Sequence, residues 1–177
     1  PLEASRDANA FAALIASRAR RGYYPRPFID EGIFWTIVGP AEGDREALIS
    51  EDGAVEVDKQ AFSIEPFIFT NGRLLTWADA KTTQSLALGF VPVPTVLREY
   101  DGVQLSITAA ADGKQDDSSL LLRYQIKNIT NRQATGDLVL AIRPFQVNPP
   151  YQWLNATGGV ARVEQIAVAG TTERTIT

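Results

Sequence analysis

The sequence contains no histidine, no cysteine and no methionine among its 177 residues. Without histidine there is no Ser-His-Asp triad, no imidazole proton shuttle and no imidazole ligand for a metal ion. Without cysteine there is no thiolate nucleophile, no disulfide bond and no zinc–thiolate cluster. These absences exclude most nucleophilic and metal-centred chemistries, and we expect the chain to use neither a cofactor nor a metal.

The missing methionine concerns the origin of the chain rather than its chemistry. The chain begins Pro1-Leu2-Glu3, which predicts that it is a piece of a longer protein. A signal peptide would lie upstream of Pro1, and a chain without cysteine suits either redox compartment. The sequence therefore leaves the localisation open.

Charge and apolar runs exclude two further classes of partner. The 17 basic and 21 acidic residues give a net charge of −4, and the longest basic run is Arg20-Arg21. Nucleic-acid binding needs a clustered basic surface, so we expect no nucleic-acid partner. No apolar stretch approaches the ~18 residues of a membrane span, so none is expected.

The first 27 residues are predicted to form a helix and a linker, and residues 28–177 a β domain. Phe11, Leu14, Ile15 and Arg18 recur at helical spacing, which predicts one amphipathic helix over residues 5–21. Gly22 ends this helix, and the prolines that follow exclude further helix up to residue 27.

After residue 30 the pattern is that of strands. Asp52-Gly53 and Asn71-Gly72 each lie between apolar runs, and such dipeptides indicate tight hairpins. Apolar and polar residues alternate over 103–111 and 120–127 on either side of a polar turn at 112–117. The run 137–145 is more continuously apolar than the other strands, which favours a central strand buried on both faces. With further strands expected at 33–38, 160–168 and 173–176, the predicted fold is an all-β antiparallel sandwich.

The segment after the 137–145 strand carries the candidate binding residues. Its prolines, Pro149 and Pro150, forbid regular pairing. Aromatic rings beside amide side chains suit saccharides, because a ring stacks on a sugar face and amides bond to hydroxyls. The predicted site comprises Arg143, Gln146, Asn148, Tyr151 and Trp153. The alternative is a structural crossover whose aromatic residues plug the end of the sandwich.

Several carboxylates of the sequence have the chemistry of catalytic pairs or metal ligands. Glycoside hydrolysis needs two carboxylates flanking the bond, and Asp30, Glu31, Glu65 and Asp79 are conceivable members. Nothing in their spacing selects a pair, so no catalytic residue is predicted. The acidic stretch 42–58 lacks the pattern of a calcium loop and favours a solvated hairpin.

Four segments resemble a known family. They are 69–79, 91–94, 122–128 and 138–155, with the Tyr124-x-Ile126-x-Asn128 strand among them. Together they resemble the β-supersandwich (galactose-mutarotase-like) domains of large bacterial carbohydrate-active proteins with six-hairpin-glycosidase-like and discoidin (coagulation factor 5/8 type) regions. The similarity covers about residues 28–168. Mutarotases use histidines, which this chain lacks, so the resemblance implies a non-catalytic domain whose parent carries its acid and base carboxylates in a helical toroid elsewhere.

Two functions follow as expectations from these features. The first is an accessory β-sandwich of a multidomain glycoside-hydrolase-like or phosphorylase-like protein, with neighbouring domains of the same polypeptide and an oligosaccharide as partners. The second is a structural or protein-interaction module without a sugar site. An autonomous carboxylate-based hydrolase is a third and weaker alternative.

Overall fold

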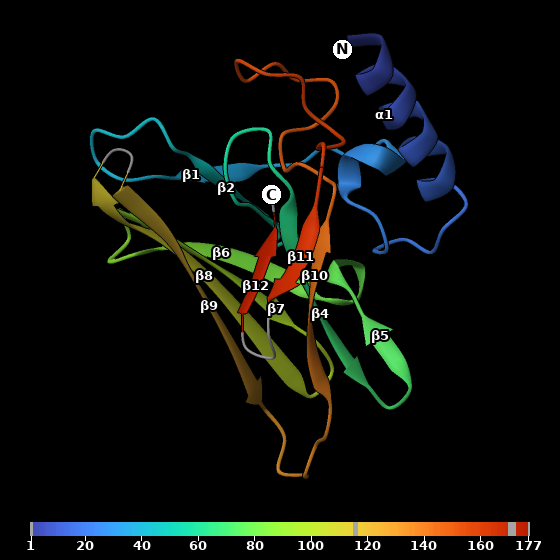
Figure 1. The fold of residues 1–177 in the computed structure, drawn as a ribbon. Helices are drawn as coiled ribbons and strands as arrows, with labels where there is room; N and C mark the ends of the chain where they lie inside the picture. The colour runs from blue at the N-terminus through green and yellow to red at the C-terminus, as the bar shows by residue number, and fades with distance from the viewer. Residues whose placement is uncertain (1, 115–116, 170–172, 177) are drawn as a thin grey trace.

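The computed structural model describes residues 2–114, 117–169 and 173–176. Two antiparallel sheets form the body of the molecule, and a single α-helix, α1 (Leu2–Ala16), lies at its margin (Figure 1). The all-β antiparallel sandwich with one N-terminal helix is thereby confirmed. No helix in the described part of the chain is long and apolar enough to cross a membrane.

The first sheet follows the order β1-β2-β3-β4-β10, and β5 also pairs with β4. Its strands are β1 (Trp35–Val38), β2 (Ala47–Ser50), β3 (Val55–Glu56), β4 (Ser63–Thr70), β5 (Arg73–Leu75) and β10 (Asp137–Arg143). Both predicted hairpins are present. Asn71 and Gly72 have φ of 51° and 71°, the two left-handed positions that the tight β4–β5 turn requires.

The second sheet is a meander of β6 (Lys81–Ala87), β7 (Val91–Glu99), β8 (Val103–Lys114) and β9 (Asp117–Asn128). The β8–β9 hairpin pairs from Val103 with Asn128 to Lys114 with Asp117. The strands thus extend into the predicted polar turn, and residues 115–116 of that turn lie outside the described residues. The sequence analysis predicts neither β6 nor β7. Pro92 and Pro94, both in β7, lack the backbone N–H that a paired strand donates. The structure accommodates both prolines where β7 pairs only with β6.

Two short 3₁₀ helices and a C-terminal hairpin complete the described chain. The helix η1 (Arg26–Ile29) comes before β1 in the chain, and the helix η2 (Trp77–Asp79) comes directly before β6. The hairpin consists of β11 (Ile166–Ala169) and β12 (Glu173–Ile176). Strand β11 starts six residues later than the strand predicted at 160–168. Residues 159–161 instead form backbone hydrogen bonds with residues 144–148.

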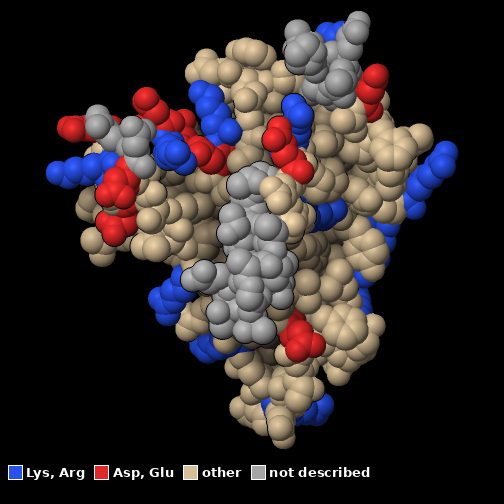
Figure 2. All heavy atoms as spheres, in the orientation of Figure 1, with Lys and Arg blue, Asp and Glu red and all other residues tan. Residues whose placement is uncertain are grey.

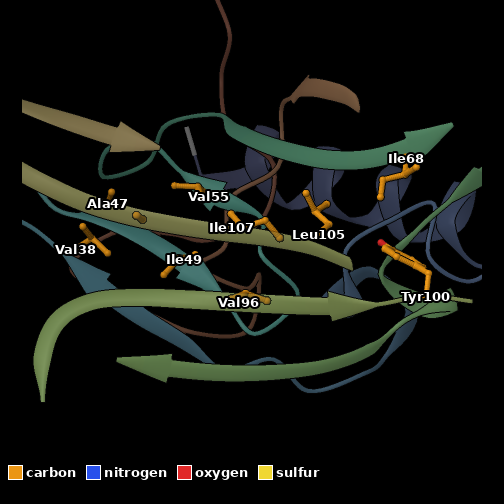
Figure 3. Packing of buried hydrophobic residues seen from close by; sticks show 10 residues of the cluster. Val38, Ala47, Ile49, Val55, Ile68, Val96, Tyr100, Leu105 and Ile107 are labelled. Atoms are coloured by element: carbon orange, nitrogen blue, oxygen red, sulfur yellow. The ribbon is translucent and has the colours of Figure 1, made fainter. Parts of the chain in front are cut away.

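The main core lies between the two sheets (Figure 3). Val55 and Ile49 of the first sheet pack in one cluster with Val96, Leu105 and Ile107 of the second. Leu105 and Ile107 are fully buried, while the polar residues that alternate with them in β8, Gln104, Ser106 and Thr108, are only partly buried. The alternation read from residues 103–111 is thus the alternation of core and outer faces.

The prediction that residues 137–145 form a central strand is wrong. Among the described residues β10 is the outermost strand of the first sheet, paired with β4 alone. Val139, Leu140 and Ile142 are each about two-fifths exposed. A continuous apolar run indicates burial of both faces, but it does not determine where in the sheet order a strand lies.

The helix α1 packs through its small residues. Ala12 and Ala16 are buried against Phe28 and Phe145 in a second, smaller core. The helix ends at Ala16, five residues earlier than predicted, and a turn leads to Gly22. At Gly22 φ is +96°, and an added Cβ would lie 2.0 Å from the Thr76 side-chain oxygen. Glycine is therefore required where this turn approaches η2.

Candidate functional site

The predicted site lies on a loop, residues 144–161, that leaves β10 and returns beside it. Its two ends meet in an isolated bridge between Phe145 and Val160. The backbone N–H of Gln146 donates to Gly159 O at 2.7 Å, and Gly159 N–H donates to Asn148 O at 2.8 Å. The loop is thus a closed, hydrogen-bonded unit even though Pro149 and Pro150 interrupt regular pairing.

Two of the predicted binding residues secure the loop from inside. Gln146 and Asn148 are 5% and 3% exposed. Their amide N–H groups donate to the backbone oxygens of Thr157 (3.3 Å) and Ala156 (3.4 Å) across the loop. Their amide oxygens are buried without a hydrogen-bond partner among the described residues. Burial therefore keeps both side chains from contact with a ligand on the surface.

A buried carboxylate, Glu56 of β3, holds the loop to the first sheet. It accepts hydrogen bonds from the backbone N–H of Asn148 at 2.9 Å and of Gln60 at 3.1 Å. Burial raises the pKa of Glu56 to about 7, although these bonds and one from Val147 act in the opposite direction. Glu56 thus links two loops to one strand through a group that titrates near neutral pH.

The helix α1 closes the other side of the loop through Asn9. Its amide N–H donates to Gly158 O at 3.1 Å, and its amide oxygen accepts from Val160 N–H at 2.7 Å. Gly159 has φ of +105°, and a Cβ there would lie 2.2 Å from the Asn9 oxygen. The close approach of helix and loop therefore requires glycine at 159.

Arg143, at the start of the loop, is an interior ion-pair partner. Its guanidinium binds the Glu65 carboxylate at 2.5 Å, and Glu65 is only 2% exposed. The guanidinium also lies 5.2 Å from the Tyr24 ring centroid and 4.7 Å from that of Phe145. Burial raises the pKa of Glu65, while the positive charges of Arg143 and Arg98 oppose that shift. Arg143 thus joins β10 to β4 and to the N-terminal segment.

The remaining two predicted residues do face solvent. Tyr151 is 64% exposed and Trp153 is 66% exposed. Trp153 pairs with Thr157 in a bridge around Asn155, whose φ is 54°. Of the five predicted residues, the structure therefore offers two aromatic rings at the surface, on a loop whose other side is fixed by buried hydrogen bonds.

Three of the four conceivable catalytic carboxylates, Glu31, Glu65 and Asp79, form ion pairs with arginines. Glu31 is paired with Arg21 at 2.6 Å and with Arg26 at 2.8 Å. Asp79 accepts hydrogen bonds from Thr76 and is paired with Arg20 and Arg73. Burial raises the pKa of Asp79, but the Thr76 hydrogen bonds and the two arginine charges together lower it below its usual value. Of these pairs, Arg20–Asp79 joins the segment after α1 to the sandwich. No group of metal-ligating side chains occurs within residues 2–114, 117–169 and 173–176.

Two features were missed by the sequence reasoning. One is Arg98 of β7, fully buried, which donates to the backbone oxygens of Asp52 and Pro66 across the core. The alternation of buried and exposed residues along β7 is the one signal that would have placed the Arg98 side chain in the core, and the sequence analysis did not predict β7. The other is a cleft of about 500 Å³ between β1 and β6, with Phe34, Trp35 and Leu86 among its lining residues. Strands of both sheets line it, and no local sequence pattern predicts which strands lie side by side.

Comparison of the chain with protein-family models, with curated proteins and with solved structures finds no match. The fold and the site therefore have to be interpreted from their own chemistry. On the face shown in Figure 2, basic and acidic side chains are interspersed and separated by broad uncharged areas.

Proposed function

We propose that the chain is a non-catalytic accessory β-sandwich of a multidomain, glycoside-hydrolase-like or phosphorylase-like protein, and that it binds saccharide through Tyr151 and Trp153. The observation that carries this proposal is the exposure of both rings on the 144–161 loop. Stacking on a sugar needs an accessible apolar ring face held at a fixed position, since a mobile ring loses conformational entropy on binding.

The construction of the loop supports a preorganised binding surface. Four groups fix its inner side: the buried carboxylate of Glu56, the buried amides of Gln146 and Asn148, and the half-buried amide of Asn9. Asn155 is exposed beside Trp153 and has an amide suited to bonding sugar hydroxyls. The predicted site is thereby narrowed from five residues to the two rings, with Asn155 as the polar neighbour.

Substitution of the two rings tests the proposal. Trp153→Ala should weaken oligosaccharide binding about tenfold or more, and Tyr151→Ala about fivefold, because truncated aromatic anchors dominate losses at binding sites. Affinity for a panel of α- and β-linked oligosaccharides is measured by calorimetry. Phe90→Ala is the matched control, because Phe90 is 76% exposed at the tip of the β6–β7 hairpin, away from the loop.

The control also separates the proposal from a general apolar effect. Thermal unfolding of all three variants should match the wild type, since exposed side chains contribute little to stability. Equal weakening by Phe90→Ala, or no effect of Trp153→Ala on a measurable affinity, would contradict the assignment.

A second function, a protein-interaction module, is favoured by other exposed apolar residues. Phe34, Leu88 and Phe90 are each more than three-quarters exposed. Phe34 lines the cleft between the sheets, and the other two lie in the turn between β6 and β7. Scattered apolar residues are normal on a surface, but large ones close to a cleft mark interfaces. If wild-type protein binds no oligosaccharide of the panel, this alternative replaces the first.

A further inference from the structure

The helix α1 turns its large apolar side chains away from the domain. Phe11 is 65% exposed, Leu14 51% and Ile15 38%, while Ala12 and Ala16 on the opposite side are buried. The helix forms the upper right margin of the molecule in Figure 1. An amphipathic helix normally buries its large apolar residues, so this arrangement leaves a face without a partner among the described residues.

Charged residues bracket this apolar face at both ends. At about 100° per residue, Asp7, Phe11, Leu14, Ile15 and Arg18 fall within an arc of about 100°. Ser17 N–H still bonds to Ala13 O, and Arg18 lies in the tight turn that continues the helix. Asp7 and Arg18 are both exposed, and neither forms a salt bridge with any residue whose side chain is described. The face therefore carries a negative end, an apolar middle and a positive end.

The order of these residues is self-complementary. Their spacing of four, three and four residues from Asp7 to Arg18 is that of a helix–helix contact seam. Placed antiparallel on a second copy, with position numbers summing to 25, Phe11 of each copy faces Leu14 of the other. In the same register Asp7 of each copy faces Arg18 of the other. A parallel arrangement would instead oppose Asp7 to Asp7 and Arg18 to Arg18, which is unfavourable.

We propose that the outer face of α1 is a self-association surface, on which a second copy of this chain packs its own α1 antiparallel. Charge complementarity indicates that the partner is a second copy of the chain. In one antiparallel register, apolar residues of each copy oppose apolar residues of the other, and Asp7 opposes Arg18. Each copy contributes only about five residues, far fewer than the roughly 20–30 of a standard interface. The dimer is therefore weak, with a dissociation constant between about 10 μM and 1 mM.

Charge reversal tests the register without disturbing the fold, because both positions are exposed. In Asp7→Arg both charge contacts of the antiparallel dimer become Arg–Arg, and in Arg18→Asp both become Asp–Asp. Each variant alone should dimerise about fivefold or more weakly than wild type in sedimentation velocity at up to about 1 mM. An equimolar mixture should recover the wild-type affinity as a heterodimer, since every contact then joins Asp to Arg. The double variant should recover it as a homodimer.

The control is Arg6→Asp, an exposed arginine on the same helix outside the arc, which should leave the dimer unchanged. Circular dichroism of every variant should show the wild-type helix signal. A wild-type chain that stays monomeric at about 1 mM would overturn the proposal. So would single variants that associate as wild type does, or a mixture no stronger than its components.

Discussion

At the scale of single residues, the most unusual feature of this protein is that three charged side chains are buried in its interior. Glu56, Glu65 and Arg98 are each at most 2% exposed. Buried charges require partners, and these are found as backbone groups or as a single ion pair. Glu56 differs from Glu65 because its partners are neutral backbone N–H groups, so no positive charge opposes its protonation.

The stability of the protein should therefore fall as pH rises across the titration of Glu56. The group's pKa is 4.5 in an unperturbed chain and about 7 in the folded protein. Below pH 4.5 it is protonated in both states, and ionising it above that pH favours the unfolded state until pH 7 is passed. The free energy of unfolding should drop by about 3 kcal/mol between these limits.

Glu56→Gln isolates this contribution. The amide oxygen of glutamine can accept only one of the two backbone bonds, because they go to different oxygens of Glu56, so the variant loses one bond at every pH. It also lacks the group that titrates, so its stability relative to wild type should be higher at pH 8 than at pH 4.5 by about 3 kcal/mol. Urea unfolding at several pH values measures the difference. Glu65 also has a raised pKa and contributes to the pH dependence of both proteins. The contribution of Glu56 is therefore the difference between the free energies of unfolding of wild type and variant at each pH. A difference that does not change with pH would show that Glu56 does not titrate in this range.

At the scale of elements, the contact between α1 and the 144–161 loop fixes the candidate site. It consists of two Asn9 hydrogen bonds and the close approach of Gly159. Helix residues and loop residues some 150 positions apart in the chain thus define one surface. The helix is an integral support of the loop that carries Tyr151 and Trp153.

Gly159→Ala should destabilise the protein more than a positive φ alone explains. A left-handed backbone costs a residue with a Cβ about 1–2 kcal/mol, and overlap with Asn9 adds about 1–3 kcal/mol. Gly72→Ala is the matched control, because Gly72 has φ of +71° but nothing within 4 Å of the added Cβ. Chemical denaturation of both variants gives the comparison, and equal losses would contradict the proposed helix–loop contact.

Elements specified by local chemistry could be predicted, and those that depend on sheet order could not. Asn71-Gly72 determines its own turn geometry, and the alternation over 103–111 reports a buried face directly. The apolar run 137–145 predicts a strand but not its edge position. The helical spacing of Phe11 and Leu14 predicts a helix, yet the alanine side packs on the domain because only small residues fit so close to the loop.

The candidate site divides along the same line. Tyr151 and Trp153 follow a strand end and a proline pair, which predicts a loop but not exposure. Arg143, Gln146 and Asn148 have the chemistry of ligand-binding residues, but the same donors also satisfy buried backbone oxygens and a carboxylate. Sequence distinguishes these roles poorly, because the deciding partners, such as Glu65, lie far away in the chain.

At the scale of the whole molecule, two sheets form the core and a helix-supported loop at one end presents two rings. The three tryptophans of the chain lie in three different settings, which makes them internal probes. Trp77 is 2% exposed and its indole N–H donates to Tyr24 O at 3.3 Å, Trp35 lines the cleft, and Trp153 is exposed on the loop. A ligand on the loop should therefore perturb one indole and leave the others unchanged.

The most direct test of the proposed saccharide site is a titration of ¹⁵N-labelled protein with the oligosaccharide panel, followed through the three indole N–H signals. The account predicts that the Trp153 signal shifts in a saturable manner with at least one oligosaccharide, while the Trp77 signal stays in place. A Trp153 signal unmoved by every oligosaccharide, or a shift confined to Trp35, would contradict it.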